Sequence, residues 1–446
     1  MSLDLCIIGG GLAGALAALS AAQHGARVVL VHHAPGATAM HTGVFDVDAA
    51  PARIKKIEIP ENNDFSANIQ DTLIANPHHP YARLGDNIPG VMRDALEFAA
   101  ARLALAGLPL AGSTDQWMLL ATQLGTLRRV RLCLQTMAAG DISQMKNANL
   151  LVIGPRGLDG FRPAAAAATI KHLADRVSPG LIGRSAGALI DAPVASHTPN
   201  LAPYHFAPLM DSADSRDEFF EHAAQAVKEH AATHVAFPAV MGVHDPAAVI
   251  DAASHRLGAP CFELAAAPPS VPGQRLENAL ARALRKADIP VVRARATGFS
   301  AGDKDVFSIS VQTPLGDTQD IQASAFVLAS GKFTAGGLAR QDALVESLFD
   351  LPVFYNGWPA RDTFMYDLVT PSFADSQPIF SCGLMLDFRL RPADQQGRRV
   401  WRNLFAAGSV LGGYDPFQDR CGSGVAMATA FAAGRAAAES AMGEQR

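Results

Sequence analysis

The chain has 446 residues, of which 49% are hydrophobic and 18% charged, so it is long enough to bury a sizeable core and is not a disordered protein. Its formal net charge of −5 gives no electrostatic reason to expect nucleic acid as a partner. The five cysteines are far apart and form no C-x-x-C pair, so neither a zinc site nor an iron–sulfur motif is expected, and isolated thiols suit a reducing compartment.

The chain opens on a predicted βαβ unit with a glycine-rich turn. An apolar run at 5–8 reads as a buried strand, residues 12–24 carry Leu and Ala at helical spacing, and 27–31 is a second β-branched strand. Between the first strand and the helix lie the glycines of a G-x-G-x-x-G motif: Gly9, Gly10, Gly11 and Gly14. This arrangement is typical of a dinucleotide site, in which the pyrophosphate lies at the helix N-terminus. A tight turn without a ligand is the alternative.

The second strand ends in His32 and His33, where a dinucleotide site usually has an Asp or Glu that accepts hydrogen bonds from the ribose. A neutral histidine can hydrogen-bond to a ribose and a protonated one can approach a phosphate, but neither holds ribose as well as a carboxylate. We therefore expect phosphate binding at the glycine turn, while the way in which the ribose is held stays open.

The apolar start has the features of neither a signal peptide nor a membrane span. Asp4 stands where a basic n-region would be, and the glycine turn interrupts the apolar run. Elsewhere no stretch reaches the roughly 20 uninterrupted apolar residues that a span needs. We expect a cytoplasmic protein without direct membrane insertion, whose contact with the inner membrane, if any, comes through a partner.

Helices and strands alternate along the rest of the chain, as in an α/β protein. Loops with short elements are predicted at 34–89 and a loop at 193–208. The predicted helices lie at 91–107, 217–231, 246–257 and 276–287, and a further, alanine-rich helix ends at residue 175. The predicted strands lie at 117–134, 149–153, 234–237, 291–297, 306–313 and 326–329.

Two glycine-containing turns in the middle of the chain have ordinary structural explanations. Residues 183–187 match the G-x-S-x-G elbow of hydrolases, but nearby prolines leave no room for the strand that must precede it, so a small-residue turn is favoured. The turn at 154–160 lacks dinucleotide spacing, and we interpret it as a strand-to-helix crossover rather than an anion site for Arg156 and Arg162.

Three histidines match metal or cofactor motifs only in part. His230 and His234 have the spacing of metal ligands on a helix, but Ala231 replaces the expected Glu and His234 begins a strand. His41 lies in a stretch similar to one through which some flavoproteins bind flavin covalently; a loop histidine near a non-covalent ligand is favoured.

Two later segments predict close backbone approach to a flat ligand. The strand at 326–329 ends in Ser330 and Gly331, and glycine leaves no side chain in the way. The C-terminal segment has the same arrangement. A strand leads to Gly408 and Ser409, and a second glycine turn begins a long helix near Gly424 and Val425. A helix N-terminus at this place would stabilise negative charge on a reduced flavin. We therefore predict an α/β fold: a Rossmann-like, two-dinucleotide-binding-type flavoprotein domain (1–60 plus 288–446) with a large inserted α/β domain (61–287).

These residues resemble the B subunit of the bacterial anaerobic glycerol-3-phosphate dehydrogenase over nearly the full length. The resemblance is carried by IIGGGLAGALAAL (7–19), HPYARLG (79–85), LGTLR (124–128), PPSVPGQRLENAL (268–280), LASGKFTAGGL (328–338), and NLFAAGSVLGGYDPF with CGSGVA (403–426). The stretches at 268–280 and 403–417 are the most specific. Around 205–212 the chain departs from the family pattern by lacking an arginine, so no phosphate-binding role is transferred to that region.

The resemblance implies a flavoprotein subunit that acts with a catalytic A-type flavoprotein subunit and an iron–sulfur C-type subunit. Together they oxidise a small-molecule substrate, glycerol 3-phosphate, to dihydroxyacetone phosphate and pass electrons to quinone. The cofactor implied is a non-covalent flavin: FMN by the family resemblance, FAD by the glycine turn. A chain without clusters needs iron–sulfur partners, because a flavin can accept a hydride and release single electrons but cannot carry them far.

Further residues are expected at this site by their positions. Thr42 and Gly43 follow the second strand and would contact the ribityl chain or phosphates. Arg275, beside prolines, is the candidate for a positive charge near flavin or substrate, with a structural salt bridge as the alternative. His79 is the candidate general base. The other functions left open are a stand-alone flavin-dependent oxidoreductase of another small substrate and a non-catalytic subunit that keeps the fold as a scaffold.

Overall fold

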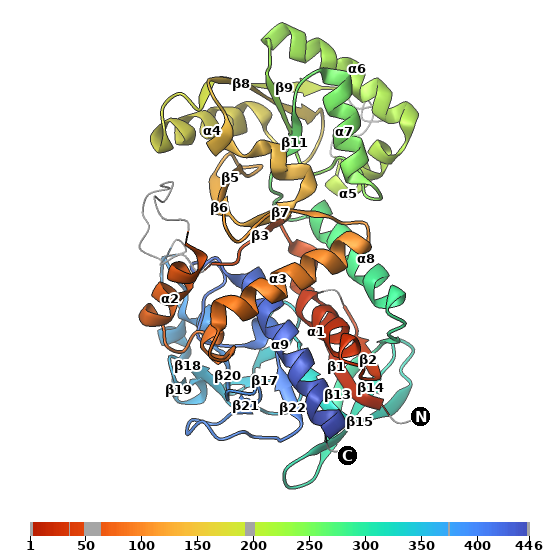
Figure 1. The fold of residues 1–446 in the computed structure, drawn as a ribbon, viewed down its shortest axis with the longest axis vertical. Helices are drawn as coiled ribbons and strands as arrows, with labels where there is room; N and C mark the ends of the chain where they lie inside the picture. Colours follow the sequence, from red (N-terminus) through yellow and green to blue (C-terminus); the bar gives the residue numbers. More distant parts are fainter. Residues whose placement is uncertain (1–2, 35, 49–63, 192–200, 373–374, 444–446) are drawn as a thin grey trace.

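The computed structural model describes residues 3–34, 36–48, 64–191, 201–372 and 375–443, and two hydrophobic cores account for their fold. The larger core draws on both ends of the chain, and the smaller core lies within residues 119–271. Figure 1 shows the elements of the smaller core as a separate lobe above the larger one. No helix among the described residues is both long enough and apolar enough to cross a membrane.

The larger core is built on a seven-stranded sheet. Its order is β12-β2-β1-β15-β14-β13, and β22 also pairs with β15. The strands are β1 (Leu3–Ile8), β2 (Val28–His32), β12 (Val291–Arg293), β13 (Arg295–Ala301), β14 (Val306–Gln312), β15 (Thr318–Leu328) and β22 (Leu404–Ala406). The pairs β12–β2, β2–β1, β1–β15 and β15–β22 are parallel. Because parallel strands end at the same edge, the segments that follow β1, β2, β15 and β22 meet there.

Strand β15 is longer than the segment 326–329 that was predicted. Residues 318–322 pair antiparallel with β14, whereas 323–328 pair in parallel with β1. The first half is mostly exposed and polar, so apolar periodicity marks only the buried second half. The β13-β14-β15 meander therefore extends the parallel sheet on one side.

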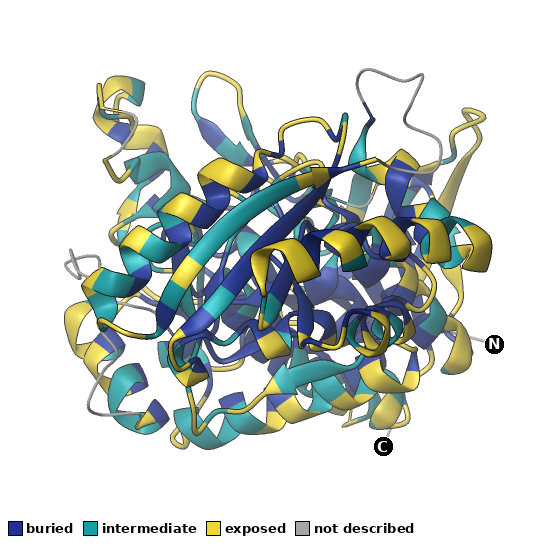
Figure 2. Cartoon of the chain, turned by 90° about the horizontal axis from the view of Figure 1, so that it is seen from above, coloured by how far each residue is buried: buried dark blue, intermediate teal, exposed yellow. Residues whose placement is uncertain are grey.

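Helices cover this sheet closely because their contact residues are small. The helices are α1 (Leu12–Gln23), α3 (Ile88–Leu105), α8 (Val271–Lys286) and α9 (Gly422–Gly443). A Cβ at Gly434 of α9 would overlap the carbonyl oxygen of Ala17 in α1, and the Ser20 hydroxyl donates to the Phe431 carbonyl oxygen at 2.8 Å. Helix α3 packs over α8 and α9. Figure 2, which looks down onto the smaller lobe, shows helices with exposed outer faces on either side of its strands.

Short elements complete the two cores and the connection between them. They are β3 (Val44–Phe45), β4 (Leu110–Gly112) and β7 (Leu132–Leu134) in one sheet; the hairpin β5 (Met118–Ala121) and β6 (Leu127–Val130); β16 (Leu338–Arg340) with β17 (Leu344–Glu346); β18 (Val353–Tyr355), β19 (Trp358–Pro359), β20 (Gly383–Leu386) and β21 (Pro392–Ala393); and the helices α2 (Phe65–Ala75) and α5 (Pro203–Phe206).

The smaller core is a four-stranded parallel sheet of order β11-β10-β8-β9 with helices against it. Its elements are β8 (Ala148–Pro155), α4 (Pro163–Val177), β9 (Ile182–Ile190), α6 (Ala213–His230), β10 (His234–Phe237), α7 (Pro246–Leu257) and β11 (Cys261–Glu263). The G-x-S-x-G stretch at 183–187 lies inside β9 and is extended, so the predicted turn is wrong. A Cβ at Gly187 would overlap the backbone of Ala164 in α4, which explains a small residue there.

The inserted unit is narrower than the predicted range 61–287. Helices α3 and α8 fall inside that range, yet their apolar faces belong to the larger core. Periodicity identifies an apolar face but not the surface that it packs against.

Candidate functional site

At Gly9, Gly10 and Gly14 the turn between β1 and α1 leaves no space for a side chain. Gly9 has a φ of +119°, a conformation that favours glycine, and a Cβ there would overlap the carbonyl oxygen of Ala329. A Cβ at Gly14 would overlap the Gly9 carbonyl oxygen, so α1 begins directly against the turn. Gly11 is the N-cap residue of α1, with a φ of −75°. The turn is therefore a close backbone cradle at a helix N-terminus, which suits a pyrophosphate.

The segment after β2 closes over this turn through Thr38, which the sequence analysis missed. Thr38 lies in a short 3₁₀ helix, Gly36–Met40, and its Oγ1 accepts a hydrogen bond of 2.9 Å from Leu12 N in the first turn of α1. A Cβ at Gly273 of α8 would lie 2.9 Å from the Thr38 carbonyl oxygen. The segment is thus held between α1 and α8. A threonine in a loop carries no motif, so only its contacts reveal this position.

The end of β2 offers histidine rather than carboxylate. A Cβ at Gly10 would lie 2.5 Å from His32 Cγ, so this ring covers the turn. His32 Nδ1 is buried and has no hydrogen-bond partner in the described part of the chain. His33 is largely exposed. The part of its ring that the protein covers, together with the charges of Arg295 and His32, lowers its pKa. A buried ring nitrogen without a partner is a group that a ligand hydroxyl can satisfy.

The segments after β15 and β22 meet at the same edge. Gly331 has a φ of +76°, and a Cβ there would lie 3.7 Å from Ser409 Oγ. Gly408 has a φ of +78°, and a Cβ there would lie 2.5 Å from Ala13 Cβ on α1. Ser330 Oγ is buried and unpartnered within the described residues. The structure therefore gathers these predicted residues around the glycine turn and leaves a polar atom for a ligand.

The N-terminus of α9 contacts the loop that follows residue 40. Gly424 N donates to the Asp46 carbonyl oxygen at 2.8 Å, and His41 Nε2 lies 3.3 Å from Ser423 Oγ. A Cβ at Gly424 would overlap the Tyr81 hydroxyl oxygen, so only glycine fits this packing. The first turn of α9 thus lies beside this loop, and its Gly424 N–H is bonded to the protein itself.

The other predicted residues of this region have structural contacts. The Thr42 carbonyl oxygen accepts a hydrogen bond of 2.9 Å from Ala266 N. Gly43 has a φ of +91°, and a Cβ there would overlap the Met137 side chain. The Val425 side chain is fully buried in the larger core.

Taken together, the described residues fit a flavin nucleotide: a phosphate cradle, two unpartnered polar atoms (His32 Nδ1 and Ser330 Oγ) and a helix N-terminus lie along one sheet edge.

Comparison with known proteins decides the family. The model of the FAD binding domain family matches residues 4–425. The chain belongs to this family. It is also 30% identical to the probable anaerobic glycerol-3-phosphate dehydrogenase B subunit of Halobacterium salinarum, over 98% of each chain. It is 29% identical to the anaerobic glycerol-3-phosphate dehydrogenase B subunit of Vibrio vulnificus, over 97% of this chain and 95% of that protein.

These matches confirm the predicted flavoprotein fold and the resemblance to the B subunit, and the chain is a flavin-dependent oxidoreductase subunit. Among solved structures, the 3-ketosteroid delta1-dehydrogenase of Sterolibacterium denitrificans has a TM-score of 0.43 at 12% identity, and the match covers 98% of this chain and 99% of that one. In the described ranges, no group of three or more His, Cys, Asp or Glu side chains could hold a metal ion.

Lys332 is a buried lysine in the segment that follows β15, and no sequence motif points to it. Its Nζ donates to the Phe380 carbonyl oxygen at 2.5 Å and lies 5.0 Å from the centroid of the Tyr414 ring. Burial lowers the pKa of Lys332 to about 8, although nearby acidic groups, including Asp415, oppose the shift. The Tyr414 hydroxyl is buried and has no partner among the described residues.

The position of His79 argues against the predicted role as a general base. The side chain is 1% exposed. Its Nδ1 accepts from Tyr81 N at 3.2 Å, and its Nε2 lies 3.4 Å from Cys421 Sγ. Burial lowers the pKa of His79 to about 3, so the ring is neutral. An enclosed ring that caps the short helix Pro80–Arg83 acts structurally, because a base must reach the substrate proton.

Arg275 forms a structural salt bridge, the alternative to the predicted role beside flavin or substrate. It lies in α8 rather than in a loop, and its guanidinium pairs with Glu263, with Nη1 to Oε2 at 2.6 Å and Nη2 to Oε1 at 2.9 Å. Nε and Nη2 also donate to the Gly242 carbonyl oxygen. Both side chains are at most 1% exposed. These donors are already used inside the protein, so Arg275 is not placed to meet a flavin or a substrate.

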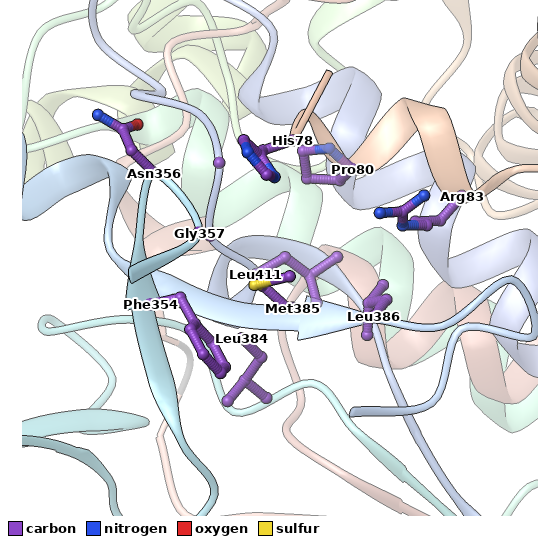
Figure 3. A pocket seen from close by; sticks show the side chains of 13 residues that line it. His78, Pro80, Arg83, Phe354, Asn356, Gly357, Leu384, Met385, Leu386 and Leu411 are labelled. Atoms are coloured by element: carbon purple, nitrogen blue, oxygen red, sulfur yellow. The ribbon is translucent and has the colours of Figure 1, made fainter. Parts of the chain in front are cut away.

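A hollow lies between the short helix at residues 80–83, strand β20 and residues 411–413. Figure 3 shows His78, Arg83 and Asn356 on one side and Leu384 and Leu386 on the other. Its volume of about 20 Å³ has room for a water molecule but not for a flavin.

Proposed function

We propose that the chain is the flavin-bearing B subunit of a glycerol-3-phosphate dehydrogenase, in which glycerol 3-phosphate is oxidised to dihydroxyacetone phosphate. The observation that carries this proposal is the 30% identity to such a protein over 98% of both chains. The cradle at Gly9, the unpartnered Ser330 hydroxyl and the start of α9 support it, because they are what a flavin nucleotide needs.

The flavin of this proposal is bound non-covalently. Both ring nitrogens of His41 already have neighbours: Nδ1 accepts from Gly43 N at 3.2 Å, and Nε2 lies 3.3 Å from Ser423 Oγ. The family model and the glycine turn support FAD. The histidine at position 32 supports FMN, because FMN has no adenosine ribose for a carboxylate to hold.

The chain relays electrons between a catalytic A-type flavoprotein subunit and an iron–sulfur C-type subunit. The flavin would supply the chemistry that couples two-electron oxidation to one-electron steps. All five cysteines are free and buried, which supports placing the iron–sulfur clusters on another subunit. The A-type partner would carry substrate oxidation, since neither Arg275 nor His79 is placed for it.

The test compares each subunit with the mixture. The purified chain should show a flavin absorption spectrum, and chromatography of the released cofactor against both standards identifies FAD or FMN. With glycerol 3-phosphate and a dye acceptor, the chain alone should show little turnover, and addition of the A-type partner should restore it. Robust turnover by this chain alone would contradict the relay and favour a stand-alone oxidoreductase. A colourless protein would favour a scaffold.

A further inference from the structure

A second hollow opens beside the C-terminal half of α9, and no residue of the glycine turn lines it. Its volume of about 420 Å³ lies in the range that small organic ligands occupy in proteins. It is lined by residues 83–85, 388–391 and 405 and, on α9, by Ala432, Arg435, Ala436, Glu439 and Ser440. Arg435 lies about 16 Å along α9 from Gly424, so this hollow is remote from the first turn of α9 and from the predicted flavin edge.

The lining of this hollow carries an excess of positive charge. Its charged residues are Arg83, Arg389, Arg391, Arg435 and Glu439. Arg391 is neutralised, because its Nε and Nη2 donate to Asp387 Oδ2 at 2.8 and 2.6 Å. Within the described ranges, the side chains of the other three arginines make no ion pair or hydrogen bond. Three guanidinium groups with unused donors thus face the hollow against one carboxylate, which favours an anion.

The turn that forms one wall of the hollow is held in place by its own hydrogen bonds. Asp387 Oδ1 accepts from Arg389 N at 2.8 Å and from Arg391 N at 3.0 Å. The Leu390 carbonyl oxygen accepts from Ala406 N on β22 at 2.9 Å. Leu390 has a φ of +63°, which is uncommon outside glycine and persists where the surroundings enforce it. Because this wall is fixed in advance, little entropy is lost when a ligand binds against it.

The hollow also has an apolar side. The Phe388 side chain is 76% exposed, and Arg83 Cζ lies 4.9 Å from the centroid of its ring. Leu84, Leu390 and Phe405 are buried and line the same hollow. An aromatic ring left in solvent beside cationic groups can pack against the organic part of a bound molecule. The hollow therefore offers charge for an anionic group and apolar surface for the organic group that carries it.

We propose that this hollow binds an organic phosphate, with the phosphate held by the arginines at 83, 389 and 435 and the organic part packed against Phe388. Guanidinium forks suit phosphate oxygens, because they donate parallel hydrogen bonds to them. A soluble phosphate ester and the headgroup of an anionic phospholipid share this chemistry. The site goes beyond the proposed function, and no electron-transfer step depends on it.

Isothermal titration of the purified full chain tests this site, at a salt concentration high enough to screen exposed charges. Phenyl phosphate, inorganic phosphate and phenol serve as probes. We expect phenyl phosphate to bind more tightly than inorganic phosphate, and phenol not to bind. Arg435→Gln should weaken the binding of phenyl phosphate at least tenfold, the effect of losing one charge-assisted hydrogen bond. Arg256→Gln is the matched control, because Arg256 is an exposed arginine on α7 of the smaller core.

A second variant guards against a folding defect. Arg389→Gln changes the opposite wall of the hollow and should cause a similar loss, while both variants keep the thermal midpoint and the flavin content of the wild type. Absence of phenyl phosphate binding would overturn the proposal. So would an affinity for inorganic phosphate as high as for the ester, or an equal loss in Arg256→Gln.

Vesicles distinguish the two sources of the phosphate. The chain is sedimented with vesicles of phosphatidylglycerol and phosphatidylcholine, and with vesicles of phosphatidylcholine alone. Retention on the anionic vesicles alone that Arg435→Gln abolishes identifies a phospholipid headgroup as the ligand. Binding of phenyl phosphate without retention on either kind of vesicle identifies a soluble ester. Each result supports the organic phosphate site and names its occupant.

Discussion

Arg275 on α8 and Glu263 on β11 form a buried, bidentate ion pair that joins the two cores of the protein. The Glu263 carboxylate also accepts hydrogen bonds from the Thr136 hydroxyl at 2.7 Å and from Met241 N at 2.8 Å. All of its acceptor positions are therefore directed at protein groups from both cores. A fully satisfied buried carboxylate of this kind orients one core against the other.

Removal of one partner should destabilise the protein strongly. Arg275→Met leaves the Glu263 charge buried without its partner, so we expect a loss of about 3–5 kcal/mol in the free energy of unfolding by urea. Arg275→Met combined with Glu263→Gln should recover part of this loss, because the buried charge is gone. A folded Arg275→Met protein of unchanged stability that has lost activity would instead support the catalytic role.

Substitution in the glycine turn should empty the flavin site without unfolding the domain. Gly11 has an ordinary φ of −75°, so Gly11→Val does not strain the backbone but places a branched side chain where the pyrophosphate approaches. We expect a normal circular dichroism spectrum and loss of most bound flavin. Gly9→Ala is the contrast, since its Cβ overlaps Ala329 and should lower the thermal midpoint. A full complement of flavin in Gly11→Val would place the site elsewhere.

His79 should make the protein sensitive to acid. Its pKa is about 3 in the folded protein and about 6.5 when unfolded, so below pH 6.5 the unfolded chain binds a proton that the folded chain does not. Stability is therefore present above pH 6.5 and is lost as the pH falls, by about 1.4 kcal/mol per pH unit. His79→Asn keeps a capping acceptor and should flatten this dependence in urea unfolding between pH 4.5 and 6.5. Parallel curves for both proteins would contradict the assignment.

Lys332 should make the stability of the protein depend on pH in the alkaline range. Its pKa is about 8 when folded and about 10.4 when unfolded, so between these values the unfolded chain binds the additional proton. The wild type should thus gain stability relative to Lys332→Met as the pH rises from 8 to 10, by about 1.4 kcal/mol per pH unit. The matched control is Lys286→Met, at an exposed lysine whose Nζ donates to the Leu105 carbonyl oxygen. A constant difference between wild type and Lys332→Met would refute this prediction.

The sequence alone was sufficient for the elements whose evidence is local. The β1–α1–β2 unit follows from an apolar strand, a glycine spacing and helical periodicity within about 30 residues. The long small-residue helix α9 and two strands of the smaller core, β8 and β10, follow in the same way, whereas β9 was predicted as a turn and β11 was not predicted. Each of these signals depends on neighbours in sequence, and the structure contains the corresponding elements.

The tertiary structure decided which side chains face each other. Arginine and histidine often serve in active sites, so Arg275 and His79 were reasonable candidates. Sequence spacing does not show that Glu263 neutralises Arg275 or that burial keeps His79 neutral. Thr38 and Lys332 carry no motif and gain their character only from contacts with residues far away in the chain. Burial and charge pairing depend on distances in space, and those are set when the two cores pack together.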